Sequence, residues 1–303
     1  MVGARIARSI SLLAPRLSAA GSVFPLGLRY MAASAFLFSV MALFVKLASA
    51  TVPTMQIVFV RSLVMVAMTL VLLRRENVSP WGVRKGLLMA RAASGMTGLS
   101  LLYFALSRIP LGDATAIFYM SPIWTALTAA LILRERTAGL VIAGMAVSLA
   151  GVVLTAKPSF LFGESLGALE GLAVLGVLAA SLGSGLAYTL VRKLRETDHP
   201  LVIIFYLSWV GVVGALPFAS NWVWPTGWTW VWLLGAGLAT QIAQIAMTRG
   251  LHLESAGRAT TVGYLQVAFA FGWGVLVFGT VPDTLSIVGA VLICASVLLI
   301  AKR

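Results

Sequence analysis

The chain has 303 residues, of which 60% are hydrophobic and 10% are charged, and its mean hydropathy is +1.00. Soluble domains are about half apolar and about a quarter charged, so this composition excludes a soluble globular protein and indicates an integral membrane protein. The net charge of +13 does not indicate nucleic-acid binding, because the basic residues form no stripe interleaved with aromatic side chains. We therefore expect no nucleic-acid partner.

Residues 1–27 form a basic N-terminal tail, and the first acidic residue of the chain is Glu76. Two interpretations remain open for this tail. It is either a basic cytoplasmic segment or an organelle-targeting segment, since transit peptides are rich in Arg and Ser and poor in acids. The expected location is therefore the plasma membrane or a bacterial inner membrane, with an organelle membrane as the alternative.

Apolar stretches then follow one another to the end of the chain, separated by short turns. Each is long enough to cross a bilayer, which takes roughly 20 helical residues. Backbone groups in lipid must be satisfied internally, and the alternation typical of barrel strands is absent. The sequence therefore predicts an all-α polytopic membrane protein with ten transmembrane helices, at 28–48, 54–73, 87–107, 114–133, 138–156, 166–191, 201–218, 229–250, 259–280 and 284–301.

The basic residues predict the orientation of these helices. Most of the 22 Lys and Arg residues fall at one end of the predicted bundle. The exceptions are Arg61, which lies inside a span, and Lys46, Arg108 and Lys157, which fall at the other end. The positive-inside rule then places both chain termini in the cytoplasm. The opposite end carries the uncharged loop 219–230 with four tryptophans, as expected for an aromatic belt at the outer interface.

An internal repeat relates the two halves of the chain. A shift of 145 residues places LGDATAIFYM (111–120) on AGRATTVGYL (256–265), with glycines and tyrosines aligned. We therefore predict two five-helix units, at 28–156 and 166–301. Because each unit has an odd number of spans, the second is inverted in the membrane, an arrangement typical of secondary transporters with a binding site at the repeat interface.

Several motifs make a family resemblance specific. FLFSVMALFVK (36–46), SPIWTALTAALILRE (121–135) and RGLHLESAGRATTVGYLQVAFAF (249–271) resemble the EamA-type drug/metabolite transporter superfamily, most closely the G subgroup of solute carrier family 35 and its bacterial relatives. The resemblance covers residues 28–301 and implies ten helices in two EamA repeats that move a small metabolite by alternating access. One departure is Thr280, which stands where the family often has an acid equivalent to Glu135.

Two arginines are candidate substrate-binding residues. Arg61 lies inside the second predicted helix, where insertion scales place the cost of a guanidinium at roughly 2.5–3.5 kcal/mol, so it is expected to face a wet cavity or a partner. We expect it to bind the anionic part of a solute, and the alternative is a structural pair with Asp113 or Glu170. Arg91, near the start of the third predicted helix, is either an interfacial anchor or a second binding residue.

Polar side chains within the apolar runs complete the candidate site. Such groups either hydrogen-bond a neighbouring helix or contact substrate. Pro122 lies inside the fourth predicted span, where a proline kinks a helix, so we expect it to act as a gating hinge. Its counterpart in the second repeat is Val267, which predicts an asymmetric kink. The remaining substrate-binding candidates are Tyr103, Tyr119, Ser121, Gln241, Gln244, Tyr264 and Gln266.

The sequence thus predicts a secondary transporter for a small metabolite, with an organic anion or an amino-acid-like solute favoured. The alternatives are an exporter of amphipathic drugs or aromatic compounds, a non-transport membrane scaffold, and an intramembrane enzyme. No catalytic, nucleotide-binding or metal-ligand motif is present, so we expect no catalytic residues, metal or cofactor. The expected partners are the solute and the lipid bilayer, and the expected state is a monomer or homodimer.

Overall fold

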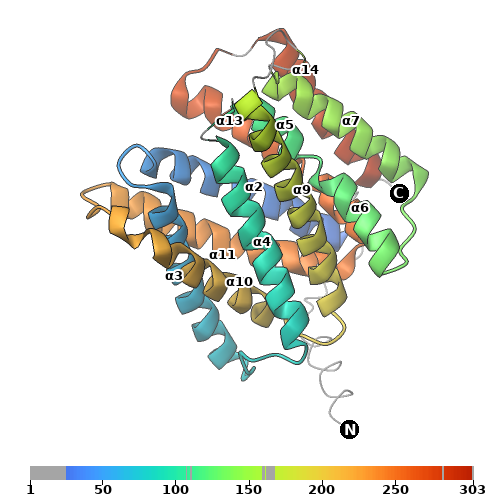
Figure 1. Ribbon diagram of the computed structural model, residues 1–303. Helices are drawn as coiled ribbons and strands as arrows, with labels where there is room; N and C mark the ends of the chain where they lie inside the picture. The colour runs from blue at the N-terminus through green and yellow to red at the C-terminus, as the bar shows by residue number, and fades with distance from the viewer. Residues whose placement is uncertain are drawn as a thin grey trace.

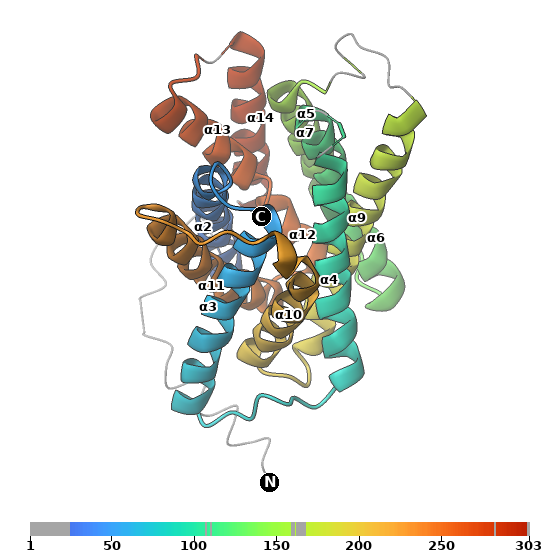
Figure 2. The same cartoon turned by 60° about the vertical axis from the view of Figure 1, so that its left-hand side comes forward.

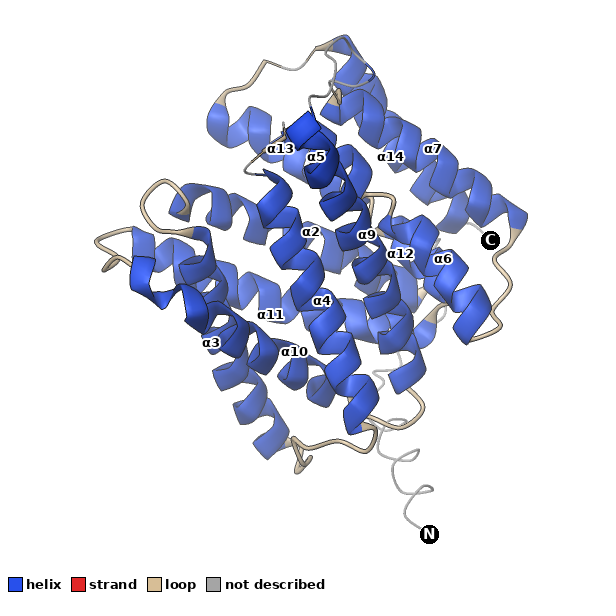
Figure 3. Cartoon of the chain, viewed as in Figure 1, coloured by secondary structure: helices blue, strands red, loops and turns tan. Residues whose placement is uncertain are grey.

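The computed structural model describes residues 25–106, 108–109, 111–158, 161, 168–281 and 283–301. Every regular element in these ranges is helical (Figure 3). Most of the predicted N-terminal tail, residues 1–24, lies outside them. The helices are α2 (Leu26–Ala48), α3 (Thr54–Arg75), α4 (Lys85–Leu106), α5 (Leu111–Phe118), α6 (Ser121–Ile132), α7 (Gly139–Ala156), α9 (Ala168–Leu194), α10 (Pro200–Ala215), the 3-10 helix η1 (Leu216–Asn221), α11 (Thr229–Leu253), α12 (Ala256–Val262), α13 (Leu265–Phe278) and α14 (Thr284–Ala301).

Nine stretches of the described chain are long and apolar enough to cross a membrane. They correspond to nine of the predicted spans. The helix outside this set is α4, the third predicted span, which carries Lys85, Arg91 and several small or hydroxyl-bearing residues. Since α4 packs between α9 and α10 rather than standing alone, its low apolar content is compatible with its place in the bundle.

Two of the membrane-length stretches are broken helices. The fourth predicted span divides into α5 and α6 at residues 119–120, and the ninth divides into α12 and α13 at residues 263–264. The predicted asymmetric kink is therefore wrong, because both halves break at the same place in their repeat. Pro122 lies in the first turn of α6, where a missing N–H costs no helical hydrogen bond, and Gly263 lies in the second break.

Helix packing relates the two halves in a symmetric manner (Figures 1 and 2). Helix α2 packs along α11, and α4 packs along α9. In the repeat, α2 corresponds to α9 and α4 corresponds to α11, so the two pairs are equivalent. In both halves an indole donates a hydrogen bond to a serine of the opposite half: Trp124 to Ser181 and Trp273 to Ser39, both at 3.0 Å.

Helices α7 and α14 lie side by side through small residues (Figure 1). A Cβ atom placed on Gly151 would lie 2.6 Å from the carbonyl oxygen of Gly289. The hydroxyl groups of Ser148 and Ser296 hydrogen-bond to each other across the same interface. Close backbone approach between small residues is a common means of helix association in membranes.

The two ends of the bundle are packed differently. The end of the bundle that contains the connections 76–84, 133–138, 195–199 and 254–255 is called the basic end. The end that contains the loop 219–230 is called the tryptophan end. At the basic end one continuous apolar cluster joins both halves, and includes Leu28, Leu88, Val191 and Leu251. At the tryptophan end buried apolar residues form two separate clusters, one among α4, α5 and α9 and one among α2, α3 and α11.

Candidate functional site

A small cavity lies where the two broken helices meet. Its walls include Tyr119, Ser121 and Pro122 from the first break and Thr260, Gly263 and Gln266 from the second. Helices α2, α9 and α11 complete the lining, with Tyr188 contributed by α9. The cavity therefore lies between the two halves and combines aromatic rings with a few polar groups.

The cavity measures about 50 Å³. Ligand pockets for small molecules measure roughly 300–1,000 Å³, whereas one water molecule needs only on the order of 10–15 Å³ of accessible volume. The described state therefore has room for a few waters and is too contracted for a metabolite. Solute binding requires the surrounding helices to separate.

Two tyrosines connect the breaks directly. The rings of Tyr119 and Tyr264 stack with their centroids 6.0 Å apart and their planes inclined by 30°. Tyr264 is fully buried, and its hydroxyl has no hydrogen-bond partner within the part of the chain that the structure describes. Since buried hydroxyl groups normally have partners, this group is available to a ligand or an ordered water.

Helix α9 is held against α6 in a way that fixes Tyr188 beside the cavity. The hydroxyl groups of Thr128 and Thr189 lie 2.7 Å apart, and Thr189 also donates to the Thr125 carbonyl at 3.3 Å. A Cβ atom on Gly185, one turn before Tyr188, would lie 2.6 Å from the Cβ of Trp124. The absence of a side chain at Gly185 therefore allows this close approach.

Arg91 lies inside the bundle, on a helix that packs along α9 and α10. It is only 4% exposed, and its Nε atom has no hydrogen-bond partner among the described residues. The structure thus places this predicted binding residue in the interior rather than at the surface of the bundle.

Arg61 occupies a different position, on α3. Its Nη1 atom lies 3.9 Å from the sulfur of Met41 on α2, and no described residue hydrogen-bonds to its Nε. Met41 follows Phe38, which lines the cavity, by three residues and so lies on the same helical face. Arg61 therefore stands further along this face, toward the tryptophan end.

The predicted glutamines separate into two groups. Gln266 lines the cavity. Gln241 is fully buried and donates to the Thr69 hydroxyl at 2.9 Å, linking α11 to α3. In the described ranges, the Oε1 atoms of Gln241 and Gln244 accept no hydrogen bond. The side chain of Tyr103, like that of Glu170, lies outside the described residues.

Sequence reasoning did not include Tyr188 and Thr260 among the candidates. Tyr188 carries the same signal that selected Tyr103, a polar hydroxyl inside an apolar span, and that signal could have found it. Thr260 aligns with Thr115 in the repeat and gave no separate signal. Their position at the cavity depends on how α9 and α12 pack, which sequence periodicity does not specify.

At the basic end, Glu135 joins the two halves through what we call the Glu135 network. Its Oε1 accepts from Arg192 Nε at 2.8 Å, and its Oε2 accepts from the backbone N–H of Ala256 at 3.0 Å. Arg192 Nη1 also donates to the carbonyls of Leu251 and His252. The first half therefore supplies a carboxylate that caps α12 and holds the ends of α9 and α11.

Among the described residues of the tryptophan end, no carboxylate network of this kind is centred on Thr280. There the Lys46 ammonium lies 4.0 Å from the centroid of the Phe278 ring, and Lys157 forms an exposed ion pair with Asp283. Exposed ion pairs contribute little stability. Polar contacts also join the two halves at this end, since Gln56 donates to the Val223 carbonyl at 2.6 Å and accepts from the Val223 N–H at 3.0 Å, and the hydroxyl groups of Thr51 and Thr229 lie 3.0 Å apart.

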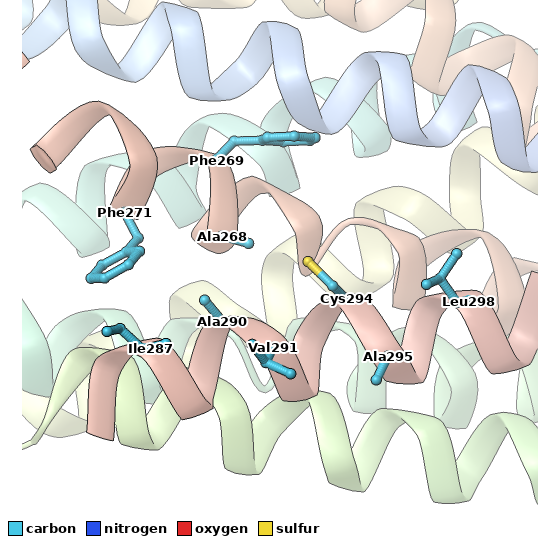
Figure 4. Close-up of a pocket in the computed structure, with 9 residues that line it drawn as sticks. All are labelled: Ala268, Phe269, Phe271, Ile287, Ala290, Val291, Cys294, Ala295 and Leu298. Carbon is cyan, nitrogen blue, oxygen red and sulfur yellow. The ribbon is translucent and has the colours of Figure 1, made fainter. Parts of the chain in front are cut away.

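A larger hollow of about 470 Å³ lies between α13 and α14. Figure 4 shows its walls, which include Phe269, Phe271, Val291 and Leu298. Apart from the Cys294 thiol it has apolar side chains only, so it lacks the convergent polar groups that orient a metabolite. Within the described residues no group of three or more His, Cys, Asp or Glu side chains could hold a metal ion.

Membrane-length apolar helices, two broken helices and a polar cavity between two halves define a multi-pass integral membrane protein of the transporter class. The chain belongs to the EamA-like transporter family, which it matches at residues 25–157 and 171–302.

Several relatives, from a bacterium, human and yeast, carry names of transport proteins. The chain is 33% identical over 271 residues to the pseudopaline exporter CntI of Pseudomonas aeruginosa, covering 89% of this chain and 93% of the relative. It is 31% identical to human solute carrier family 35 member G1, covering 89% and 77% of the two chains. A probable transport protein of Saccharomyces cerevisiae, YPL264C, is 31% identical, with 80% and 76% covered.

A solved crystal structure shares the fold. It superposes with a TM-score of 0.80 at 18% identity and covers 90% of this chain and 95% of the other. At this identity the likeness supports the fold alone. The family and its transport relatives identify a protein that moves small molecules across a membrane.

Proposed function

We propose that the chain is a secondary transporter that moves a small organic anion or amino-acid-like solute by alternating access through the central cavity. The observation that carries this proposal is the meeting of both broken helices at a contracted, partly polar cavity between the two halves. Broken helices at a repeat interface are a common way to form a solute site at membrane depth.

The proposed topology has ten spans, as two inverted five-helix repeats at 28–156 and 166–301, with both termini in the cytoplasm. The symmetric helix pairs support the two repeats. The position of α4 between α9 and α10 supports its being the tenth span. Arginines at the basic end support its cytoplasmic placement, and the proposed location is the plasma membrane or a bacterial inner membrane.

The described state corresponds to closure at the basic end. The continuous apolar cluster and the Glu135 network both hold the two halves together there, whereas the apolar packing at the tryptophan end is divided. We infer that access to the cavity alternates as these contacts at the basic end break and contacts at the other end form. Pro122, in the first turn after the first break, and Gly263, in the second break, are the proposed hinges.

Export of amphipathic or aromatic compounds is the second candidate. Phe38, Phe118 and Tyr119 in the cavity lining favour it, because aromatic rings bind apolar solutes. The pseudopaline exporter among the relatives is compatible with outward movement.

Flux in proteoliposomes tests the proposal. Purified full-length protein is reconstituted and loaded separately with organic acids, amino acids and aromatic compounds, and solute on each side is identified by mass spectrometry. We expect at least one solute to cross unchanged, and Gln266→Leu to reduce its flux while the exposed control Glu196→Gln does not. A chemically altered product would favour an enzyme, and absence of flux for every class would reject the proposal.

A further inference from the structure

Arg91 is a buried cation whose charge the described residues do not neutralise. The residue is 4% exposed, its Nε has no partner, and no carboxylate in the described ranges forms an ion pair with it. Burying a guanidinium without an anion or a full set of acceptors is unfavourable. A purely structural arginine at this depth would be expected to have such partners.

Arg192 in the same molecule shows what a structural arginine has. It is buried to a similar extent, at 8% exposed, and it is paired with Glu135 and with two backbone carbonyls. Arg91 has none of these contacts. The difference between these two buried arginines indicates that the described residues supply no anionic partner for Arg91.

The neighbours of Arg91 place it close to a wall of the central cavity. A Cβ atom on Gly95 would lie 2.8 Å from Arg91 Nη1, so the side chain folds along α4 over this glycine. Helix α4 packs antiparallel along α9, where a Cβ atom on Gly183 would lie 3.2 Å from the carbonyl oxygen of Ser94. Arg91 lies three residues before Ser94 and Tyr188 lies five residues after Gly183, so both are at a similar height in the bundle, and Tyr188 lines the cavity.

We propose that Arg91 and Tyr188 form a carboxylate-binding subsite on the basic-end side of the central cavity, and that the transported solute carries a carboxylate. This inference rests on the proposed function. The planar guanidinium fork matches the two oxygens of a carboxylate. When the cavity enlarges to admit solute, the Tyr188 ring moves aside, the guanidinium donates to the carboxylate and the tyrosine hydroxyl donates a further hydrogen bond.

Thermal stability of the purified full-length protein tests the subsite with matched probes. Succinate is compared with succinamide and benzoate with benzamide, because each pair keeps its skeleton and differs in charge. We expect a carboxylate to raise the melting temperature of the parent protein and its amide to leave it unchanged. In Arg91→Gln we expect the apparent affinity for that carboxylate to fall at least about tenfold.

Three further variants separate recognition from folding. Gly95→Ala places a Cβ atom against the guanidinium without changing any charge, and Tyr188→Phe removes only the hydroxyl, so both are expected to weaken carboxylate binding. Lys85→Gln removes an exposed positive charge from the start of the same helix and is expected to bind normally. If Arg91→Gln does not fold, Gly95→Ala and Tyr188→Phe still decide the result.

Two outcomes overturn the subsite: no tested carboxylate stabilises the parent protein, or the variants at residues 91, 95 and 188 bind like Lys85→Gln. Flux measurements on the same probes distinguish this failure from failure of the proposed function. Carboxylate binding without flux leaves the subsite standing and rejects transport. Flux of neutral solutes without carboxylate binding supports transport and rejects the subsite.

Discussion

Replacing Glu135 by glutamine disrupts the polar contact that joins the two halves at the basic end. The carboxylate accepts from Arg192 and from the Ala256 backbone at the same time. A glutamine offers one oxygen for these two donors and turns an NH₂ group toward the other. We expect Glu135→Gln to weaken closure of this end while leaving each half folded.

The structure sets the size of the effect. Hydrogen bonds to charged groups contribute about 1.5–3 kcal/mol. The Arg192 side chain is 9% exposed, but that of Glu135 is 23% exposed, and partial exposure weakens the interaction. A loss of about 1–2 kcal/mol from the closed state corresponds to a roughly 5- to 30-fold rise in the open fraction at the basic end.

Cysteine labelling in proteoliposomes measures this opening. In a Cys294→Ala background, Ser34→Cys places a thiol in the cavity lining at a position that is 2% exposed in the described state. A membrane-impermeant maleimide is added from the side of the basic end. When the protein closes again faster than the maleimide reacts, the labelling rate is proportional to the open fraction. Glu135→Gln is therefore expected to raise the labelling rate about 5- to 30-fold.

Glu196 provides the matched control. It is an acidic residue at the same end, 4.0 Å from Lys193, and its side chain is 54% exposed. Glu196→Gln is expected to leave the labelling rate unchanged. A Glu135→Gln rate within twofold of the parent, in protein that elutes and melts normally, would refute the reasoning, as would an equal rise in both variants.

Three other predictions address packing, pH dependence and the hinge. Gly151→Ala is expected to lower the free energy of unfolding in mixed micelles by about 1–3 kcal/mol through overpacking, whereas Gly139→Ala in the same helix, with open space around it, is not expected to destabilise; equal effects would contradict the close α7–α14 contact. Burial lowers the pKa of His199 below its ordinary value of 6.5, and its Nδ1 accepts from Leu201 N–H. Because the folded-state pKa lies below the unfolded value, its contribution to stability is present at pH 7 and is lost as pH falls below about 6.5. His199→Asn keeps an N-cap acceptor and should reduce the fall in melting temperature between pH 7 and pH 5. If the melting temperature of this variant depends on pH as steeply as that of the parent, His199 is not the cause. Pro122→Ala supplies a backbone N–H that allows α5 and α6 to join into one helix. Initial rates of flux should then show that turnover falls more than solute affinity does. Unaltered turnover would count against a hinge at Pro122.

The candidate site was partly visible in the sequence. Polar residues inside apolar runs selected Tyr119, Ser121 and Gln266, and the structure brings these together at the cavity. The same criterion also selected Gln241, which bonds to Thr69 instead. Hydropathy detects a polar group in a span, but it does not tell whether that group faces a cavity or a neighbouring helix.

The sequence alone determined the membrane class and nearly all the helix positions, because helix length and apolar content are local properties that the bilayer selects directly. The aligned turns with their glycines also predicted two related halves. Only the tertiary structure decided that both fourth helices of the repeats break, that Arg91 is buried inside the bundle, and that Glu135 meets Arg192. The last contact joins residues 57 positions apart, and such pairs depend on how helices pack, which is set by side-chain shape across the whole bundle rather than by any one segment.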